Sequence, residues 1–458
     1  MQTNFSPEQL ADPATAASAA IIRTCVHCGF CLATCPTYTL LGDELDSPRG
    51  RIYLMKQMLE TDSKPTDAVV KHVDRCLSCL SCMTTCPSGV NYMHLVDHAR
   101  AYIEDRYERP FAQRLIRSVI AFTLPYPKRF KIALALGRIA RPLKPLLEKY
   151  DALKPLAVML TKTPARSHAL PFAPTITSRQ ARGTKPVARA ASAKDLATLA
   201  AQSAPAHRGR VVLLQGCVES TLRPEIRDAT LRLLTRAGYE VVLAKGEGCC
   251  GALVHHLGRE AQSLASARRN IDVWIRELEK KGLDAIVITA SGCGTTIKDY
   301  GFMFRTDPVY AEKAARVSAL AKDISELLDG AGLPAAGNAP PLNVAYHSAC
   351  SMQHGQRITV APVRLLTQAG FKVRQPTEAH ICCGSAGVYN ILQPEIASKL
   401  GERKASQLDR IAPDVIATGN IGCLMQIGSY TSRPIVHTIE LLDWATGGPE
   451  PAALRARQ

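Results

Sequence analysis

Apolar residues recur along this chain in two different patterns. In the first hundred or so residues they follow the 3.6-residue period of helices, as Ile52, Met55 and Leu59 do. Ser47 followed by Pro48 predicts where that helix begins, since serine caps helices and proline suits their first position. The N-terminal part is therefore expected to be helical.

From residue 210 the apolar residues form short unbroken runs, with helical segments between them. Such runs are typical of strands buried on both faces of a parallel sheet. Each half of this region has the order strand–helix–strand–helix–strand. The predicted strands are residues 211–214, 241–243, 285–288, 344–346, 371–373 and 415–417.

The two halves also share a pattern of cysteines. In each, a single cysteine is followed after 31 residues by Cys-Cys-Gly and later by another cysteine. The first cysteine and the pair recur at an offset of 133 residues and the last at 130, which indicates an internal duplication joined near residues 330–341. The cysteines are Cys217, Cys249, Cys250 and Cys293 in the first copy, and Cys350, Cys382, Cys383 and Cys423 in the second.

These cysteines follow the carboxyl ends of predicted strands, so each set is expected to meet at one crevice of its sheet. Four thiols brought together there suggest a further metal or iron–sulfur site. The alternative is a buried, inert set kept from the duplication, and the sequence leaves both open. The nearby histidines, any of which is a candidate ligand although each alone is more typical of a structural residue, are His255, His256, His347 and His354.

The stretch between these regions is basic. In residues 106–160 apolar residues alternate with Lys and Arg, and prolines break the pattern into short helices. Such a segment can lie on an anionic membrane surface or dock a partner, or its apolar side can pack on the protein's own core. Residues 161–209, rich in Pro, Ala, Ser and Arg, predict a linker.

The positive charge of the chain is concentrated in this middle stretch. Residues 101–210 hold 21 Lys/Arg against 6 Asp/Glu, so +15 of the net +16 lies there. Nucleic acid is not an expected partner, because aromatic residues for base stacking are not interleaved with the basic ones. No run of 18 apolar residues predicts a membrane-spanning helix, and residues 1–22 do not resemble a signal peptide. A cytoplasmic protein is expected.

Eight of the sixteen cysteines form two copies of one motif, Cys-x2-Cys-x2-Cys-x3-Cys-Pro, which supplies thiolates to iron–sulfur clusters in ferredoxins. Three cysteines two residues apart wrap one face of a cluster, whereas the fourth, before proline, points elsewhere. In two-cluster ferredoxins that fourth cysteine binds the other cluster. We therefore assign one [4Fe-4S] cluster to Cys25, Cys28, Cys31 and Cys86, and a second to Cys76, Cys79, Cys82 and Cys35.

Other uses of these cysteines fit less well. Zinc sites usually take two cysteines from each loop, and disulfides are not expected in a cytoplasmic chain. Basic residues near the motifs, Arg23, Lys71 and Arg75, are expected to raise the cluster potentials.

The sequence thus predicts a multidomain chain. Residues 1–105 form an α-helical ferredoxin-type domain, because forty residues of helical pattern separate the motifs. The basic amphipathic segment 106–160 and the linker 161–209 follow. Two duplicated α/β Cys-Cys-Gly domains with parallel sheet occupy residues 210–330 and 340–445.

The residues around the motifs carry a family resemblance. Residues 23–31, Cys35-Pro36-Thr37-Tyr38, the segment 42–53 and the two Cys-Cys-Gly units resemble the iron–sulfur subunits of bacterial glycolate oxidases, over nearly the whole chain. Related architectures occur in the iron–sulfur subunits of anaerobic glycerol-3-phosphate dehydrogenase, in lactate-utilisation iron–sulfur proteins and in heterodisulfide-reductase-like subunits.

The resemblance implies a place in an oxidoreductase complex. A partner flavoprotein with FAD would oxidise glycolate to glyoxylate, and this chain would pass the electrons to a quinone or another membrane acceptor. The complex would be peripheral on the cytoplasmic face of the inner membrane. In the heterodisulfide-reductase branch each Cys-Cys-Gly unit ends in Cys-x-x-Cys and binds a noncubane cluster. Here Thr296 and Gln426 stand at the last position, so that cluster is in doubt and a cubane or an empty site is as plausible.

The chain itself shows no nucleotide-binding, phosphate-binding or nucleophile motif. Many thiolate ligands without a substrate site indicate an electron conduit, since hydride chemistry needs an organic cofactor. Two other classes remain: a catalytic reductase that works at its Cys-Cys-Gly sites, and a non-redox scaffold or zinc-bound nucleic-acid binder.

Overall fold

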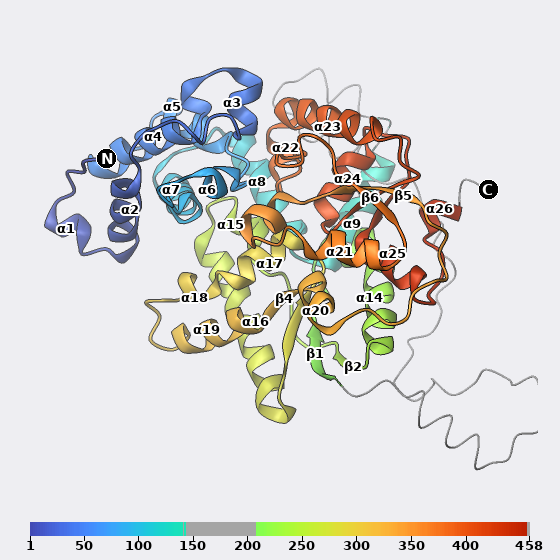
Figure 1. Cartoon of the computed structure of the whole chain (residues 1–458). Coiled ribbons are helices and arrows are strands. Elements are labelled where there is room, and N and C mark those ends of the chain that lie inside the picture. Colours follow the sequence, from blue (N-terminus) through green and yellow to red (C-terminus); the bar gives the residue numbers. More distant parts are fainter. Residues whose placement is uncertain (141, 143–207, 456–458) are drawn as a thin grey trace, which may run out of the picture.

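The computed structural model describes residues 1–140, 142 and 208–455. Its N-terminal helices lie beside two α/β units, one below and one at the upper right in Figure 1. We call residues 209–331 the first repeat and residues 343–445 the second repeat. The expected fold class, a helical ferredoxin-like part followed by two duplicated parallel-sheet units, is confirmed.

The N-terminal part is helical up to residue 106. Its helix α4 begins where the sequence predicts, since the Ser47 hydroxyl accepts a hydrogen bond from the Gly50 amide at 3.0 Å and Pro48 is the first helical residue. Gly50 allows close packing, because a Cβ there would lie 2.1 Å from the Glu44 carbonyl oxygen. The helices are α1 (Pro7–Leu10), α2 (Pro13–Thr24), α3 (Pro36–Leu41), η1 (Glu44–Asp46), α4 (Pro48–Glu60), α5 (Asp67–Asp74), α6 (Ser81–Thr85) and α7 (Tyr92–Arg106).

The first repeat holds a four-stranded sheet of order β2-β1-β3-β4, in which all neighbours are parallel. The strands are β1 (Gly209–Leu213), β2 (Tyr239–Val242), β3 (Ala285–Ile288) and β4 (Ala321–Asp323). The helices are α13 (Glu219–Leu222), α14 (Pro224–Arg236), α15 (Ala252–His255), α16 (Glu260–Lys281), α17 (Ser291–Lys298), α18 (Tyr300–Met303), α19 (Ala311–Leu320) and α20 (Ile324–Ala331).

The second repeat has the same sheet, of order β6-β5-β7-β8 and again parallel throughout. The strands are β5 (Asn343–His347), β6 (Lys372–Arg374), β7 (Val415–Thr418) and β8 (Ile435–His437). The helical elements are η4 (Ser351–Gly355), α21 (Ala361–Gln368), α22 (Tyr389–Leu392), α23 (Pro394–Asp409), α24 (Ile421–Gly428), α25 (Thr438–Ala445) and α26 (Ala452–Arg455).

The edge strands β4 and β8 were not predicted from the sequence. Each is three residues long, too short for an apolar run to stand out. They add one strand to each expected set of three.

One hydrophobic core joins the two repeats. It contains Val211 and Leu213 of β1 together with Val344 and Tyr346 of β5, all at most 1% exposed. Helix α14 of the first repeat packs against α25 of the second. The two repeats therefore pack against each other through a shared hydrophobic core.

The N-terminal helices dock on both repeats. The Tyr389 hydroxyl donates to the Arg75 carbonyl oxygen at 3.0 Å, and Thr84 is hydrogen-bonded to His354 at 2.7 Å. On the first repeat, Gly258 approaches the Arg100 carbonyl so closely that a Cβ would lie 2.3 Å from its oxygen. This docking brings the cysteine motifs against the repeats.

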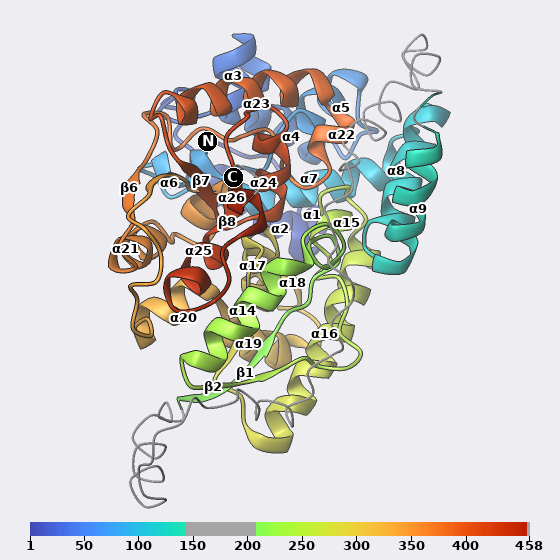
Figure 2. The same cartoon turned by 90° about the vertical axis from the view of Figure 1, so that its right-hand side faces the viewer.

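Helices α8 (Phe111–Thr123) and α9 (Pro127–Ile139) form a hairpin along one side of the molecule (Figure 2). The inner face of α8 packs Ile116 and Ile120 against Val254 and Leu257 of the first repeat. The basic segment thus packs partly on the protein's own core, which is one of the alternatives that its sequence pattern allowed. The predicted linker, residues 161–209, lies outside the described residues except for its last two, Arg208 and Gly209.

Candidate metal centres

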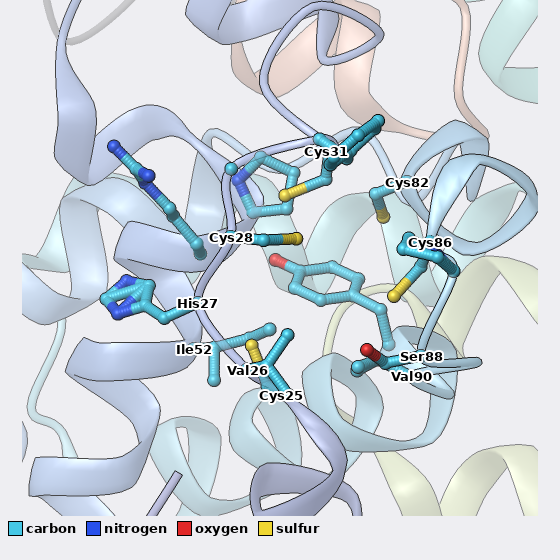
Figure 3. A pocket seen from close by; sticks show the side chains of 16 residues that line it. Cys25, Val26, His27, Cys28, Cys31, Ile52, Cys82, Cys86, Ser88 and Val90 are labelled. Atoms are coloured by element: carbon cyan, nitrogen blue, oxygen red, sulfur yellow. The ribbon is translucent and has the colours of Figure 1, made fainter.

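The first hollow collects cysteines from two separate segments. Cys25, Cys28 and Cys31 lie on the loop between α2 and α3, and Cys86 is the residue that ends α6. Their sulfur atoms face a common space in Figure 3. The loop can turn there because His27 and Gly29 adopt positive φ angles of 60° and 89°. The hollow measures about 420 Å³, including space open to solvent.

The second hollow lies directly beside the first. It is lined by Cys76, Cys79 and Cys82, which surround the start of α6, and by Cys35, the residue before α3. It measures about 320 Å³. Tyr92 and Pro48 line both hollows, as does Cys82.

Each hollow therefore combines three cysteines of one motif with the fourth cysteine of the other. These are the two groups that the sequence assigned to separate clusters. We propose these two groups of four as the ligands of two [4Fe-4S] clusters.

Several thiols of the two hollows are hard to ionise because they are buried. Burial raises the pKa of Cys31 to about 11 and that of Cys79 and Cys82 well above the usual thiol value. These thiols would stay protonated at neutral pH unless a metal replaced their protons. All sixteen cysteines are free. Thiols gathered in groups of four without disulfides fit iron–sulfur ligation.

A buried charge network stands behind the second hollow. Arg51, 1% exposed, donates to the Asp46 carboxylate at 3.2 Å and lies 3.9 Å from the Cys35 sulfur. Asp46 also accepts from Arg75 at 2.8 Å and is bonded to His72 at 2.9 Å. Because the Asp46 carboxylate is shared among these partners, net positive charge faces the cysteine sulfurs.

Burial works against the charge of Arg51, but its neighbours Cys76, Tyr92, Cys35 and Asp46 outweigh it and keep the pKa of Arg51 above its usual value. Arg75 was expected from the sequence to lie near the clusters, whereas Arg51 was not. The sequence showed that Arg51 lies in the first turn of a helix close to the motifs, but only the fold shows that its side chain is buried. Arg23, also named, bonds instead to Thr3 at 2.8 Å.

The first repeat brings its four cysteines together. The sulfur atoms of Cys217 and Cys249 are 3.5 Å apart, and Cys250 lies between Cys249 and Cys293. The Tyr300 hydroxyl donates to the Cys250 carbonyl oxygen at 2.7 Å. Three of the four are buried, and Cys293 is half-buried.

The second repeat does the same with Cys350, Cys382, Cys383 and Cys423, all buried. His347, the last residue of β5, lies with them, and burial lowers the pKa of its imidazole. The residues at the missing fifth-cysteine positions are engaged elsewhere. The Thr296 hydroxyl donates to the Gly292 carbonyl oxygen at 3.3 Å, and the Gln426 amide donates to that of Ala397 at 2.9 Å.

The histidines after the first Cys-Cys-Gly pair are not at this site. His255 bonds to Asp97 of α7 at 3.1 Å, and His256 lies near Gly387 and Arg100. They belong to the contact between the N-terminal helices and the repeats.

Comparison with known proteins agrees with this arrangement. Residues 21–90 match the model of the 4Fe-4S dicluster domain, and residues 211–298 and 344–428 match that of the cysteine-rich domain. The chain is 38% identical over 445 residues to the glycolate oxidase iron-sulfur subunit of Escherichia coli (strain K12), covering 97% of this chain and 99% of that one.

The chain belongs to the family of glycolate oxidase iron–sulfur subunits.

A second glycolate oxidase relative is more distant. The probable glycolate oxidase iron-sulfur subunit of Bacillus subtilis (strain 168) is 31% identical over 93% of this chain and 94% of its own. Lactate utilization protein A of Bacillus licheniformis is 26% identical over 51% of this chain and 99% of its own length, so it matches only part of the architecture.

Membership in the glycolate oxidase iron–sulfur subunit family makes this chain an iron–sulfur electron-transfer subunit of an oxidoreductase complex. Among the described residues, no helix has the length and apolar character needed to span a bilayer.

Proposed function

We propose that this chain carries electrons from a flavoprotein partner, which oxidises glycolate to glyoxylate with FAD, toward a quinone or another membrane acceptor. The observation that carries the proposal is the pair of adjoining hollows, each of which contains three cysteines of one motif and the fourth cysteine of the other, with Cys82 lining both. Two [4Fe-4S] clusters there would supply one-electron transfer over a short distance. The glycolate substrate is taken from the relatives of this chain.

The exposure of the two hollows suggests where electrons enter. At the first hollow Cys28 is exposed, and the neighbouring Val26 and Phe30 are 67% and 66% exposed. Exposed apolar side chains beside a redox site are typical of a partner contact. We therefore expect the flavoprotein to dock over the first hollow.

The second hollow lies deeper. Leu77 and Cys79 pack in one apolar cluster with Cys350 and Cys382 of the second repeat. Electrons leaving the second hollow would thus move toward the repeats rather than directly to solvent.

The test is a measurement on the intact complex, purified without oxygen. Two cubanes require about eight iron and eight sulfide per copy of this chain. Glycolate should reduce them, as read by electron paramagnetic resonance, in the absence of any acceptor. Reduction by lactate but not glycolate would move the chain to the lactate branch, and a colourless, iron-free complex with full activity would exclude electron transfer by this chain.

The hairpin of α8 and α9 supports a membrane-surface location. Exposed apolar side chains cover its outer face: Phe111, Leu115, Val119, Phe122, Ile132, Leu136 and Ile139. Residues 111–140 contain six Lys or Arg and no acidic residue. An apolar face with positive charge alone suits a monolayer of anionic lipids. We propose that this hairpin lies on the cytoplasmic face of the inner membrane.

Replacing the exposed Lys128, Lys131 and Arg138 with Gln should weaken vesicle binding. Each basic residue near an anionic surface is worth about 1 kcal/mol, so the triple variant should bind about 100-fold more weakly. The measurement is co-sedimentation of the complex with vesicles of phosphatidylglycerol and phosphatidylcholine. Exposed Arg276, Lys280 and Lys281 at the end of α16 provide a matched control triple that should bind normally. Equal binding by both triples would rule out this hairpin as the contact.

A further inference from the structure

The two repeats are built alike, but their cysteine sites are not equivalent. In the second repeat the donor atoms of His347, Cys383 and Cys423 all lie within 4.8 Å of one another. At the offset of 133 residues the first repeat has Leu214 in place of His347. The second site therefore has a nitrogen donor that the first lacks.

His347 has no other evident role. Its side chain is fully buried, and among the described residues its ring nitrogens meet no hydrogen-bond partner other than the adjacent thiol of Cys383. Burying an unpaired polar group costs roughly 1–3 kcal/mol for each lost hydrogen bond. An imidazole kept at such a cost beside thiols is explained if one nitrogen binds a metal.

A second difference is a buried cation. Lys404 of α23 is 1% exposed, and its ammonium donates to the Glu378 carbonyl oxygen at 2.6 Å. Within the described chain it forms no ion pair with a carboxylate. The glycine of each Cys-Cys-Gly packs against the following helix, at Ser263 in the first repeat and Ala397 in the second. Equivalent positions of these two helices are thus 134 residues apart in the sequence. The position equivalent to Lys404 in the first repeat is the neutral Asn270.

We propose that the second repeat binds one zinc ion through His347, Cys383, Cys423 and a fourth thiolate, that of Cys382. Cys382 lies against Cys383, and the Gly384 amide donates to its sulfur at 3.4 Å. Three cysteines and one histidine in a closed, buried, four-coordinate set are a common structural zinc site. This site is independent of the electron-transfer proposal.

Spacing and charge both favour a single ion over a cubane. The donor atoms of His347, Cys383 and Cys423 lie within 4.8 Å of one another, which leaves no room between these three for a cube of iron and sulfide. On binding, Zn²⁺ replaces three thiol protons, which leave to solvent, so the site carries one negative charge. The ammonium of Lys404 would balance that charge. A buried ion pair of this kind avoids the cost of an isolated buried charge.

The first test counts metals in the purified full-length chain after dialysis against a chelator. The unaltered chain should retain about one zinc per copy, as a closed four-ligand site does. His347→Leu, which copies the residue of the first repeat, should retain less than about a tenth of that zinc, while its iron content stays unchanged. His347→Cys, which restores a soft ligand, should retain zinc. A chain without zinc, or a His347→Leu variant that loses iron in its place, would overturn the proposal.

X-ray absorption at the zinc edge of the unaltered chain decides the matter even if His347→Leu fails to fold. One nitrogen at about 2.0–2.1 Å and three sulfurs at about 2.3 Å are expected. A shell of sulfur alone would contradict His347 as a ligand. Loss of the iron signals from the unaltered chain would count against the electron-transfer proposal only, since zinc is measured separately.

Discussion

Cys79→Ser is expected to stop electron flow through the complex while leaving glycolate oxidation by the flavin intact. Cys79 lines the second hollow with Cys35, Cys76 and Cys82, and a serine hydroxyl is a poor ligand for iron at neutral pH. Changes even outside the ligand shell of a metal can cost 10–100-fold in activity, so acceptor reduction should fall by at least about 100-fold. About four of eight irons should be lost.

Stopped-flow absorbance of the flavin and electron paramagnetic resonance of the clusters measure the two halves of this prediction. Glycolate should still bleach the flavin, and the signal of one cluster should disappear. Cys293→Ser, the same change at the half-buried cysteine of the first repeat, should keep both N-terminal cluster signals. If Cys79→Ser abolished flavin reduction as well, the second hollow would be needed for assembly rather than for electron transfer.

Arg51→Met is expected to weaken both the fold and the second cluster. The substitution removes the hydrogen bonds of Arg51 to Asp46, Thr37 and the His72 carbonyl oxygen. Asp46 keeps Arg75 and His72, so the loss should be about 2–4 kcal/mol of unfolding free energy, at or below the usual cost of breaking a buried pair. Chemical denaturation of the loaded chain measures it.

The same change removes a positive charge near the Cys35 sulfur. With an effective dielectric constant near 20, one charge several ångströms away amounts to roughly 2 kcal/mol, or on the order of 100 mV for one electron. The potential of the second cluster should therefore become more negative by about that amount in a redox titration. Arg51→Lys retains the charge and should keep most of the potential while losing part of the stability. A potential that did not move in Arg51→Met would mean that the charge of Arg51 is screened by Asp46.

Much of the site could be predicted from sequence because its signals are local. A cluster motif is a run of cysteines at fixed spacing, and a proline after the fourth tells which way that cysteine points. The Cys-Cys-Gly units could be paired by their offset, and their strands by short apolar runs. Edge strands β4 and β8 gave no such signal, since three residues cannot show a period.

Long-range contacts had no comparable signal. Arg51 is one of several basic residues in its segment, and its burial against Asp46 and Cys35 depends on α3, α4 and α5 folding together. His347 follows an apolar strand and is one histidine among several in the sequence. That its buried ring nitrogens meet only thiols is visible only once the strands and the Cys-Cys-Gly loop are in place.

The sequence by itself determined which residues carry the chemistry: the eight motif cysteines, the two duplicated sets of four, and the basic segment between them. These follow from spacing and composition, which can be read from the order of residues along the chain alone. The tertiary structure alone decided how these parts meet. The two hollows share Tyr92, the second of them packs against Cys350, and a histidine lies among the cysteines of only one repeat. The physical reason is that packing between distant segments fixes burial and charge, and a sequence pattern describes only neighbours along the chain.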